Sequence, residues 1–239
     1  MKSLKELYRI GIGPSSSHTI GPRIAAETYL RNHPDAQGFR VTLYGSLAAT
    51  GKGHLTDYAI LQVLGENRTE LIWCPEIVLP FHPNGMKFEV RKNNNDFQDE
   101  WIVYSVGGGA LVEDGKQQTE TPEVYDLDHL SDIQQWCQER GVSYWEYVQH
   151  CEGSEIWDYL EKVWHTMCEA VERGIEHEGV LPGVLKLRRK APDYYIRAMG
   201  YPSNLQSRAF VFAYALAVSE ENASGGTIVT APTCGASGV

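Results

Sequence analysis

Apolar residues in the first half of the chain follow helical spacing in some segments and strand-like spacing in others. Helical spacing predicts a short first helix, a second that begins at Thr19 or Gly21 and continues through Leu30, and a third over residues 54–64. Glycine and proline in residues 11–14 break the chain between the first two. Alternating or continuous apolar runs predict strands at residues 39–45, 72–79, 86–92 and 101–106. This half is therefore predicted to be an α+β module.

Strand signals stop near Asp126, and helical spacing dominates the second half. It predicts helices at residues 133–140 and 154–173, and a buried helix at residues 210–218, which are apolar on every side. The tract from residue 176 to 203 is rich in Gly, Pro, Lys and Arg and is expected to be a long crossing loop. The predicted class is α+β, with a sandwich-like α/β domain at residues 1–125 and the start of an all-helical domain at residues 126–239. The last residues, GASGV, fall in an expected tight turn, which indicates a truncated chain.

Charge and composition indicate which classes of partner the chain is expected to bind. The chain has 239 residues, of which 42% are hydrophobic, as in ordinary globular proteins. Lys and Arg number 21 against 31 Asp and Glu, a formal net charge of -10, and a negative field repels phosphate backbones and anionic membranes. No apolar stretch reaches the roughly 18 residues of a bilayer span, and the first residues lack a secretory signal. We expect a soluble cytoplasmic protein that binds neither nucleic acid nor membrane.

Cysteine usage argues against disulfides. The chain has five cysteines, an odd number, and they are widely spaced without a CxxC pair. For most of them a buried, inert thiol is the favoured interpretation. Cys234 differs, because it lies in a Gly- and Pro-rich turn that could present a thiolate to a metal cluster. A close-packed helix contact explains the small residues around it equally well.

A hydroxyl-rich loop is the first candidate for chemistry. Within GIGPSSSHTIGP, at residues 11–22, glycine and proline hold an irregular backbone around Ser15, Ser16, Ser17, His18 and Thr19. Hydroxyls and backbone N–H groups at the start of a helix favour an anion such as a carboxylate. The alternative is an ordinary helix cap, but a cap needs one hydroxyl rather than four beside a histidine.

A second glycine-rich segment, YGSLAATGKGHLTD at residues 44–57, resembles a phosphate-binding loop but fails that pattern. Five residues rather than four separate Gly45 from Gly51, and Gly53 stands where the magnesium-binding hydroxyl belongs. What remains is Lys52 and His54 on a turn at a helix start. An imidazole there has a suitable pKa for a general base, although a hydrogen bond at the helix end is an equal alternative for His54.

A third segment, FHPNGMKFEV, is predicted to be a turn between two strands, with Asn84 and Gly85 at positive φ. A hairpin turn needs no function, and a structural role is favoured for the neighbouring His82.

Six motifs occur together in the order and spacing of one enzyme family: GIGPSSSHTIGP, YGSLAATGKGHLTD, HPNGM, YSVGGGALV, EGVLPG and EENASGGTIVTAPTCGASG. From Leu4 to Val239 the chain resembles the bacterial single-chain iron-sulfur L-serine dehydratases, or L-serine ammonia-lyases. The resemblance implies β-elimination of water from L-serine, giving pyruvate and ammonia. It also implies an N-terminal α/β domain, an all-helical catalytic domain, and three cysteines that hold a 4Fe-4S cluster with one open iron.

The resemblance also implies roles for individual residues. It places the serine carboxylate near the SSSHT loop, with Asn222 and Thr233 as further substrate contacts, and makes His18 or His54 the base, with Lys52 beside them. Residues of the HPNGM turn, His82 and Asn84, are implied to bind a second serine or a partner subunit, and a homodimer is expected.

Two departures from the family concern the cluster. Its best-known members carry APTNGACG, with the ligand cysteine seventh, whereas here Cys234 is fourth and Ser237 seventh. The other ligand cysteines are expected beyond Val239, so these 239 residues alone are expected to lack an intact cluster and to be inactive. Two other functions remain open. One is a pyridoxal-phosphate dehydratase with Lys52 as the Schiff-base lysine, and the other is an amino-acid-sensing or dimerisation module without catalysis.

Overall fold

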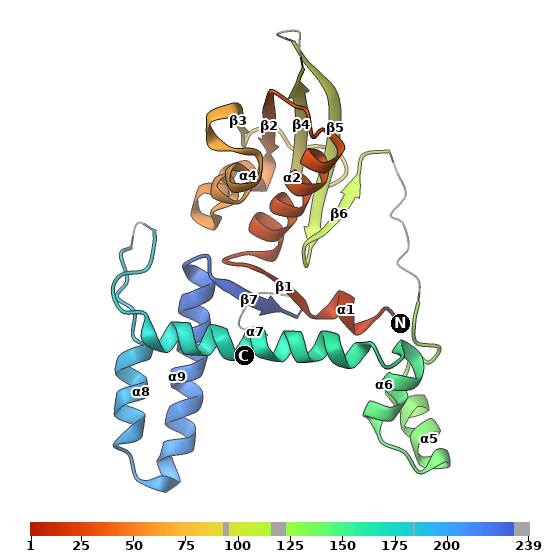
Figure 1. Ribbon diagram of the computed structural model, residues 1–239, viewed down its shortest axis with the longest axis vertical. Coiled ribbons are helices and arrows are strands. Elements are labelled where there is room, and N and C mark those ends of the chain that lie inside the picture. Colours follow the sequence, from red (N-terminus) through yellow and green to blue (C-terminus); the bar gives the residue numbers. More distant parts are fainter. Residues whose placement is uncertain (93–95, 116–122, 184, 232–239) are drawn as a thin grey trace.

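The computed structural model describes residues 1–92, 96–115, 123–183 and 185–231. A five-stranded sheet and several long helices confirm the predicted α+β class. The sheet lies at one end of the molecule and helix α7 (Ile156–Glu176) crosses its middle (Figure 1). On the side of α7 away from the sheet lie α5 (Leu130–Arg140), α6 (Tyr144–Glu152) and α8 (Ala191–Met199). Helix α9 (Ser203–Ala223) pairs with α8 there and then runs past α7 toward the sheet (Figure 1). The division of the chain near residue 125 stays a prediction.

The main sheet is mixed, with one parallel pair. Its strands, in spatial order, are β3 (Thr69–Cys74), β2 (Gly38–Tyr44), β4 (Gly85–Arg91), β5 (Phe97–Gly107) and β6 (Ala110–Glu113). Strands β2 and β3 run parallel and are joined through helix α4 (Thr56–Leu64), whereas the other pairs are antiparallel. Helices α2 (Gly21–Asn32) and α4 cover one face of the sheet (Figure 1).

The core lies between these helices and the sheet. Alternate residues of β2 and β4 point toward the helices and are at most 1% exposed: Phe39, Val41, Leu43, Met86, Phe88 and Val90. Tyr29 of α2 stacks on Trp101 of β5 with ring centroids 5.9 Å apart. Burial of each such large side chain contributes about 1.5–3 kcal/mol. The uncovered face instead carries ion pairs, such as Arg40 with Glu70 at 2.9 Å.

A two-stranded ribbon joins the two ends of the described chain. Strand β1 (Arg9–Ile12) pairs antiparallel with β7 (Thr227–Thr230), with Gly11 opposite Ile228. Because β1 leads directly into the hydroxyl-rich loop, this pairing brings residues 13–20 beside the corner between α9 and β7.

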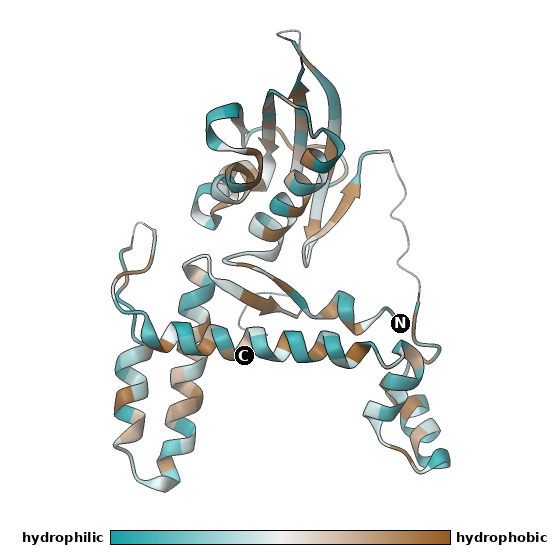
Figure 2. Ribbon diagram, in the orientation of Figure 1, coloured by the Kyte–Doolittle hydropathy of each residue, from teal (hydrophilic) through white to brown (hydrophobic). Residues whose placement is uncertain are grey.

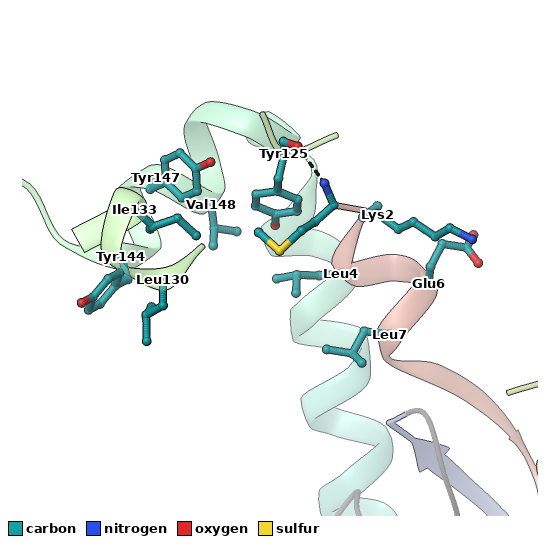
Figure 3. A pocket seen from close by; sticks show the side chains of 12 residues that line it. Lys2, Leu4, Glu6, Leu7, Tyr125, Leu130, Ile133, Tyr144, Tyr147 and Val148 are labelled. Carbon is teal, nitrogen blue, oxygen red and sulfur yellow. Dashed lines mark hydrogen bonds between the residues drawn. The ribbon is translucent and has the colours of Figure 1, made fainter. Parts of the chain in front are cut away.

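The N-terminal segment packs against α5 and α6. The Met1 ammonium donates to the carbonyl of Tyr125 at 2.8 Å, and Glu152 accepts from the Ser3 hydroxyl at 2.7 Å. Helix α1 (Leu4–Leu7) forms one wall of an apolar groove of about 570 Å³ (Figure 3). The candidate site residues do not line this groove.

The predicted loop over residues 176–203 is wrong, because it contains α8. Pro192 lies in the first turn of α8, where its missing N–H is not needed. The backbone N–H groups of Lys190 and Ala191 donate to Glu220 of α9, at 2.7 and 3.3 Å. Because this cap comes from a helix far away in the chain, the residues around the start of α8 do not indicate a helix start. Helix α6 was also not predicted, although Ser143 and Glu146 form a capping box at its start.

The prediction of a helix buried on every side at residues 210–218 is wrong as well. In α9, Val211 and Phe212 are 64% and 65% exposed. The helix buries the side that carries Ala217 against α7, where a Cβ built on Gly174 would lie 2.4 Å from the Ala217 carbonyl oxygen. Helix α7 itself alternates hydrophilic and hydrophobic residues along its length (Figure 2), as an amphipathic helix does.

Two local predictions need smaller corrections. The strand predicted at residues 72–79 ends at Cys74. Strand β4 pairs with β2 rather than β3, so the His-Pro-Asn segment, residues 82–84, is not a hairpin turn. Neither Asn84 nor Gly85 has positive φ. The helix predicted from His54 begins at Thr56, because Leu55 adopts a left-handed conformation that separates it from a preceding 3₁₀ turn, Gly51–His54.

Among the described residues, no helix combines the length and the apolar character that crossing a bilayer requires.

Candidate active site

The hydroxyl-rich loop ends in a single π-helical turn, Ser16–Ile20, that leads into α2. The amide of Ile20 donates to the carbonyl of Ser15 at 3.1 Å, five residues back, and the amide of His18 donates to the Ser15 hydroxyl at 3.1 Å. Ser15 therefore caps this turn, as the alternative interpretation of the loop proposed, while Ser16 and Ser17 remain partly exposed.

His18 is held through both ring nitrogens. Its Nδ1 lies 3.0 Å from the hydroxyl of Ser17, and its Nε2 lies 3.1 Å from the hydroxyl of Ser46, on helix α3 (Gly45–Thr50). Burial and the neighbouring His54 lower the pKa of His18 below its ordinary value. The imidazole of His18 is therefore neutral at neutral pH.

His54 lies beside His18, with ring centroids 4.8 Å apart. Its Nδ1 is 3.0 Å from the carbonyl oxygen of Thr50. A carbonyl only accepts, so Nδ1 must carry the proton and Nε2 must carry the lone pair in the neutral ring. Within the described part of the chain, Nε2 of His54 has no hydrogen-bond partner. This nitrogen is available to accept a proton from a ligand.

Two threonines tie the histidine-bearing segments together. The Thr19 hydroxyl donates to the carbonyl of His54 at 2.6 Å, and the Thr56 hydroxyl donates to the carbonyl of His18. Both threonine side chains are buried. Because its hydroxyl is engaged in this way, Thr19 supports the position of His54 rather than facing a ligand.

The corner between α9 and β7 closes the other side of the loop. The side-chain amide of Asn222 donates to the carbonyl of Pro14 at 3.3 Å, and the amide of Gly13 donates to the carbonyl of Gly226 at 3.1 Å. The structure thus brings Asn222 to the same loop as His18. Thr233 and Cys234 lie outside the described residues.

We expect Gly13→Ala to lower the free energy of unfolding by about 1–3 kcal/mol, the usual cost of overpacking. A Cβ on Gly13 would lie 2.1 Å from the backbone oxygen of Asn222, so one of the two segments must move. Gly53→Ala is the control, because a Cβ there meets no atom within 4 Å. Urea unfolding followed by circular dichroism measures both variants. Equal midpoints would contradict the close approach of loop and corner.

A buried carboxylate anchors that corner. Glu221 accepts hydrogen bonds from Arg173 Nε at 3.1 Å, Arg189 Nη1 at 3.0 Å and His177 Nδ1 at 3.0 Å. Burial alone would raise the pKa of Glu221, but these three donors outweigh it and hold the pKa below its ordinary value. Arg173 also donates to the carbonyl of Thr227, so the network fixes β7 relative to α7.

The His-Pro-Asn segment lies next to Ser46 rather than apart from the histidines. The amide of Ser46 donates to the carbonyl of Pro83 at 3.0 Å, and the amide of Asn84 donates to His82 Nδ1 at 3.1 Å. The side-chain amide of Asn84 donates to the carbonyl of Ser105 at 3.2 Å. Among the described residues, Asn84 Oδ1 and Ser105 Oγ are buried polar atoms without a hydrogen-bond partner.

Among the described residues, Lys52 makes no hydrogen bond with the hydroxyls or imidazoles of the candidate site. Its side chain is exposed and its ammonium lies 5.6 Å from the ring centroid of Trp73.

The described residues do not offer a cluster site. They contain no group of three or more His, Cys, Asp or Glu side chains that could hold a metal ion. The four described cysteines, Cys74, Cys137, Cys151 and Cys168, are free thiols. The residues that the structure describes therefore do not fit a 4Fe-4S cluster, and Cys234 lies outside them.

Sequence reasoning missed Ser46 and the partners of Glu221. Ser46 lies inside the second motif, but only the lysine and histidine of that motif were singled out. Arg173 and Arg189 are separated from Glu221 by 48 and 32 positions, so no local pattern connects them.

The sequence of the chain matches two models of known protein families. Residues 3–72 match the family model of the serine dehydratase beta chain, and residues 58–239 match that of the serine dehydratase alpha chain. The chain belongs to the serine dehydratase family. The second match alone covers most of the chain and includes His82, Asn84 and Asn222.

The chain is also similar to individual L-serine dehydratases. The chain is 33% identical to L-serine dehydratase TdcG of Escherichia coli strain K12. It is also 33% identical to an L-serine dehydratase of Haemophilus influenzae, and 35% identical to one of Mycobacterium bovis. All of the chain aligns with the Escherichia coli protein, but it spans only 64% of that protein's length.

Proposed function

We propose that the natural polypeptide containing these 239 residues is an L-serine dehydratase, which converts L-serine to pyruvate and ammonia. Family membership supports the reaction class, and relatives named L-serine dehydratase support the substrate. The observation that carries the proposal is that Nε2 of His54 has no hydrogen-bond partner among the described residues, while its ring lies beside His18 of the serine-rich loop. A base next to an anion-binding loop is what removal of a proton from an amino acid requires.

We propose that the described residues carry out two parts of the reaction. The hydroxyls of Ser16 and Ser17, with Asn222 at the same loop, are proposed to bind the serine carboxylate. His54 Nε2 is proposed to accept the Cα proton. The electron pair of the Cα–H bond forms the Cα=Cβ bond as the Cβ–O bond breaks, and His54 returns its proton to the departing hydroxide, which leaves as water. The resulting aminoacrylate is hydrolysed by a second water to pyruvate and ammonia. The neutral form of His18 favours this step, because a cation beside His54 would oppose its protonation.

The iron-sulfur cofactor, the homodimer and the cytoplasmic location remain predictions from the resemblance and the composition. Pyruvate formation is the experiment that tests the proposed reaction. The natural polypeptide is reconstituted with iron and sulfide without oxygen, supplied with L-serine, and coupled to lactate dehydrogenase. We expect pyruvate in proportion to enzyme. Its absence would refute the proposal and favour a module that binds amino acids without catalysis.

A second serine site at His82 and Asn84 is proposed as well. The unpartnered oxygens of Asn84 and Ser105 support it, because a buried polar atom without a partner costs about 1–3 kcal/mol that a ligand can recover. We expect isothermal titration to find two L-serine molecules per chain in the wild type and one in Asn84→Leu, with its fold checked by circular dichroism. A single site in the wild type would contradict the second site.

A further inference from the structure

Ser46 links His18 to the His-Pro-Asn segment. Its hydroxyl lies 3.1 Å from His18 Nε2, and its amide donates to the carbonyl of Pro83 at 3.0 Å. The preceding residue, Gly45, has φ of 47°, and its amide donates to the carbonyl of Ile77 at 2.8 Å. Two consecutive backbone amides therefore fix the start of α3 to the loop that follows β3, and with it the backbone that carries the Ser46 side chain.

The two hydroxyls around His18 differ in how much they constrain its ring. Ser17 is the neighbouring residue, so it moves with the loop that carries His18. Ser46 belongs to another element, 28 positions away in the chain. Of the two ring hydrogen bonds that the described residues make, the one with Ser46 is therefore the bond that ties the ring to α3.

We infer that Ser46 is a positioning residue for the proposed dehydration, because its hydroxyl holds the His18 ring beside His54. The inference rests on the proposed function. The rings of His18 and His54 are 4.8 Å apart with an interplanar angle of 40°. Rotation of the His18 ring about its side-chain bonds changes that distance and moves its edge relative to His54 Nε2.

A serine suits this task because a hydroxyl both donates and accepts. The contact with Nε2 therefore survives whichever nitrogen of His18 carries the proton. Ser46 controls the orientation of the ring and leaves its protonation to its surroundings.

The first test detects the hydrogen bond between Ser46 and His18 directly and does not depend on turnover. Histidine nitrogens of the natural polypeptide are labelled with ¹⁵N and compared in the wild type, Ser46→Ala and Ser46→Thr. We expect the Nε2 resonance of His18 to move in Ser46→Ala and to stay near its wild-type position in Ser46→Thr, which keeps the hydroxyl. The resonances of His33, whose Nδ1 lies 3.0 Å from the Tyr29 carbonyl, serve as the internal control. An unchanged His18 resonance in Ser46→Ala would overturn the inference.

The second test asks whether Ser46 acts through His18. Loss of one hydrogen bond to a site residue is expected to lower kcat of Ser46→Ala by about tenfold. In a His18→Ala background the same substitution is expected to have no further effect, whereas equal losses in both backgrounds would overturn the inference. If Ser46→Ala fails to fold, Ser46→Cys, of similar size, replaces it in both tests. Absence of pyruvate from the wild type would refute the proposed function, and the resonance of His18 would still decide the contact.

Discussion

Replacement of His54 by glutamine is expected to lower kcat for pyruvate formation from L-serine by about 10²–10⁴-fold, the usual contribution of a general base. Glutamine can still donate a hydrogen bond toward the Thr50 carbonyl, but its amide cannot accept a proton at neutral pH. The coupled lactate dehydrogenase assay, with saturating L-serine, measures the change. The fold is expected to persist, because the His54 side chain is partly exposed.

His165→Gln is the matched control for that prediction. His165 is exposed on α7 and has no contact with the candidate site among the hydrogen bonds and ring contacts of the described residues, so its replacement is expected to leave kcat unchanged. Wild-type turnover by His54→Gln would refute the role assigned to His54. If His18→Gln instead lost activity while His54→Gln did not, the base would be His18.

The second large effect is expected at Glu221. Glu221→Ala is expected to lower the free energy of unfolding by about 3–5 kcal/mol, because it leaves the cations of Arg173 and Arg189 without their buried partner. Arg189 is itself almost fully buried. Urea unfolding provides the measurement. Glu169→Ala is the control, since this carboxylate is 66% exposed, lies 3.8 Å from Arg173, and is expected to contribute no more than about 1 kcal/mol.

The stability that Glu221 contributes is also expected to depend on pH. Its pKa in the folded protein lies below the ordinary value of 4.5, so the unfolded chain takes up a proton first as the pH falls. The contribution is therefore complete well above pH 4.5 and is lost as the pH falls through the folded-state pKa. We expect the difference in stability between wild type and Glu221→Gln to shrink in acid. A difference that stays constant from neutral pH to below the ordinary pKa would contradict the ionised network.

Local sequence patterns predicted the helices and strands that are determined mainly by their own residues. Helix α2 and strands β2, β4 and β5 were foreseen, because their buried positions follow the helical or the two-residue period. Helix α8 was not foreseen, since Glu220 of another helix caps it. The exposed side of α9 could not be inferred either, because composition does not tell which faces have neighbours.

The same limit applies to the candidate site. Each histidine-bearing loop could be singled out from its own residues, and the resemblance placed both near the substrate. Which histidine has a free nitrogen depended on the Thr50 carbonyl and the Ser46 hydroxyl, which only the fold brings into contact with them. The adjacency of the His-Pro-Asn segment and His18 likewise arises through Ser46, from three segments far apart in the chain.

Chemical rescue tests most directly the claim that His54 removes the Cα proton of L-serine. His54→Ala in the natural polypeptide removes the ring that accepts this proton, and free imidazole can enter the space that it leaves. We expect imidazole to restore pyruvate formation in His54→Ala in proportion to its concentration, and to have no such effect on His18→Ala. Rescue of His18→Ala without rescue of His54→Ala would contradict the account.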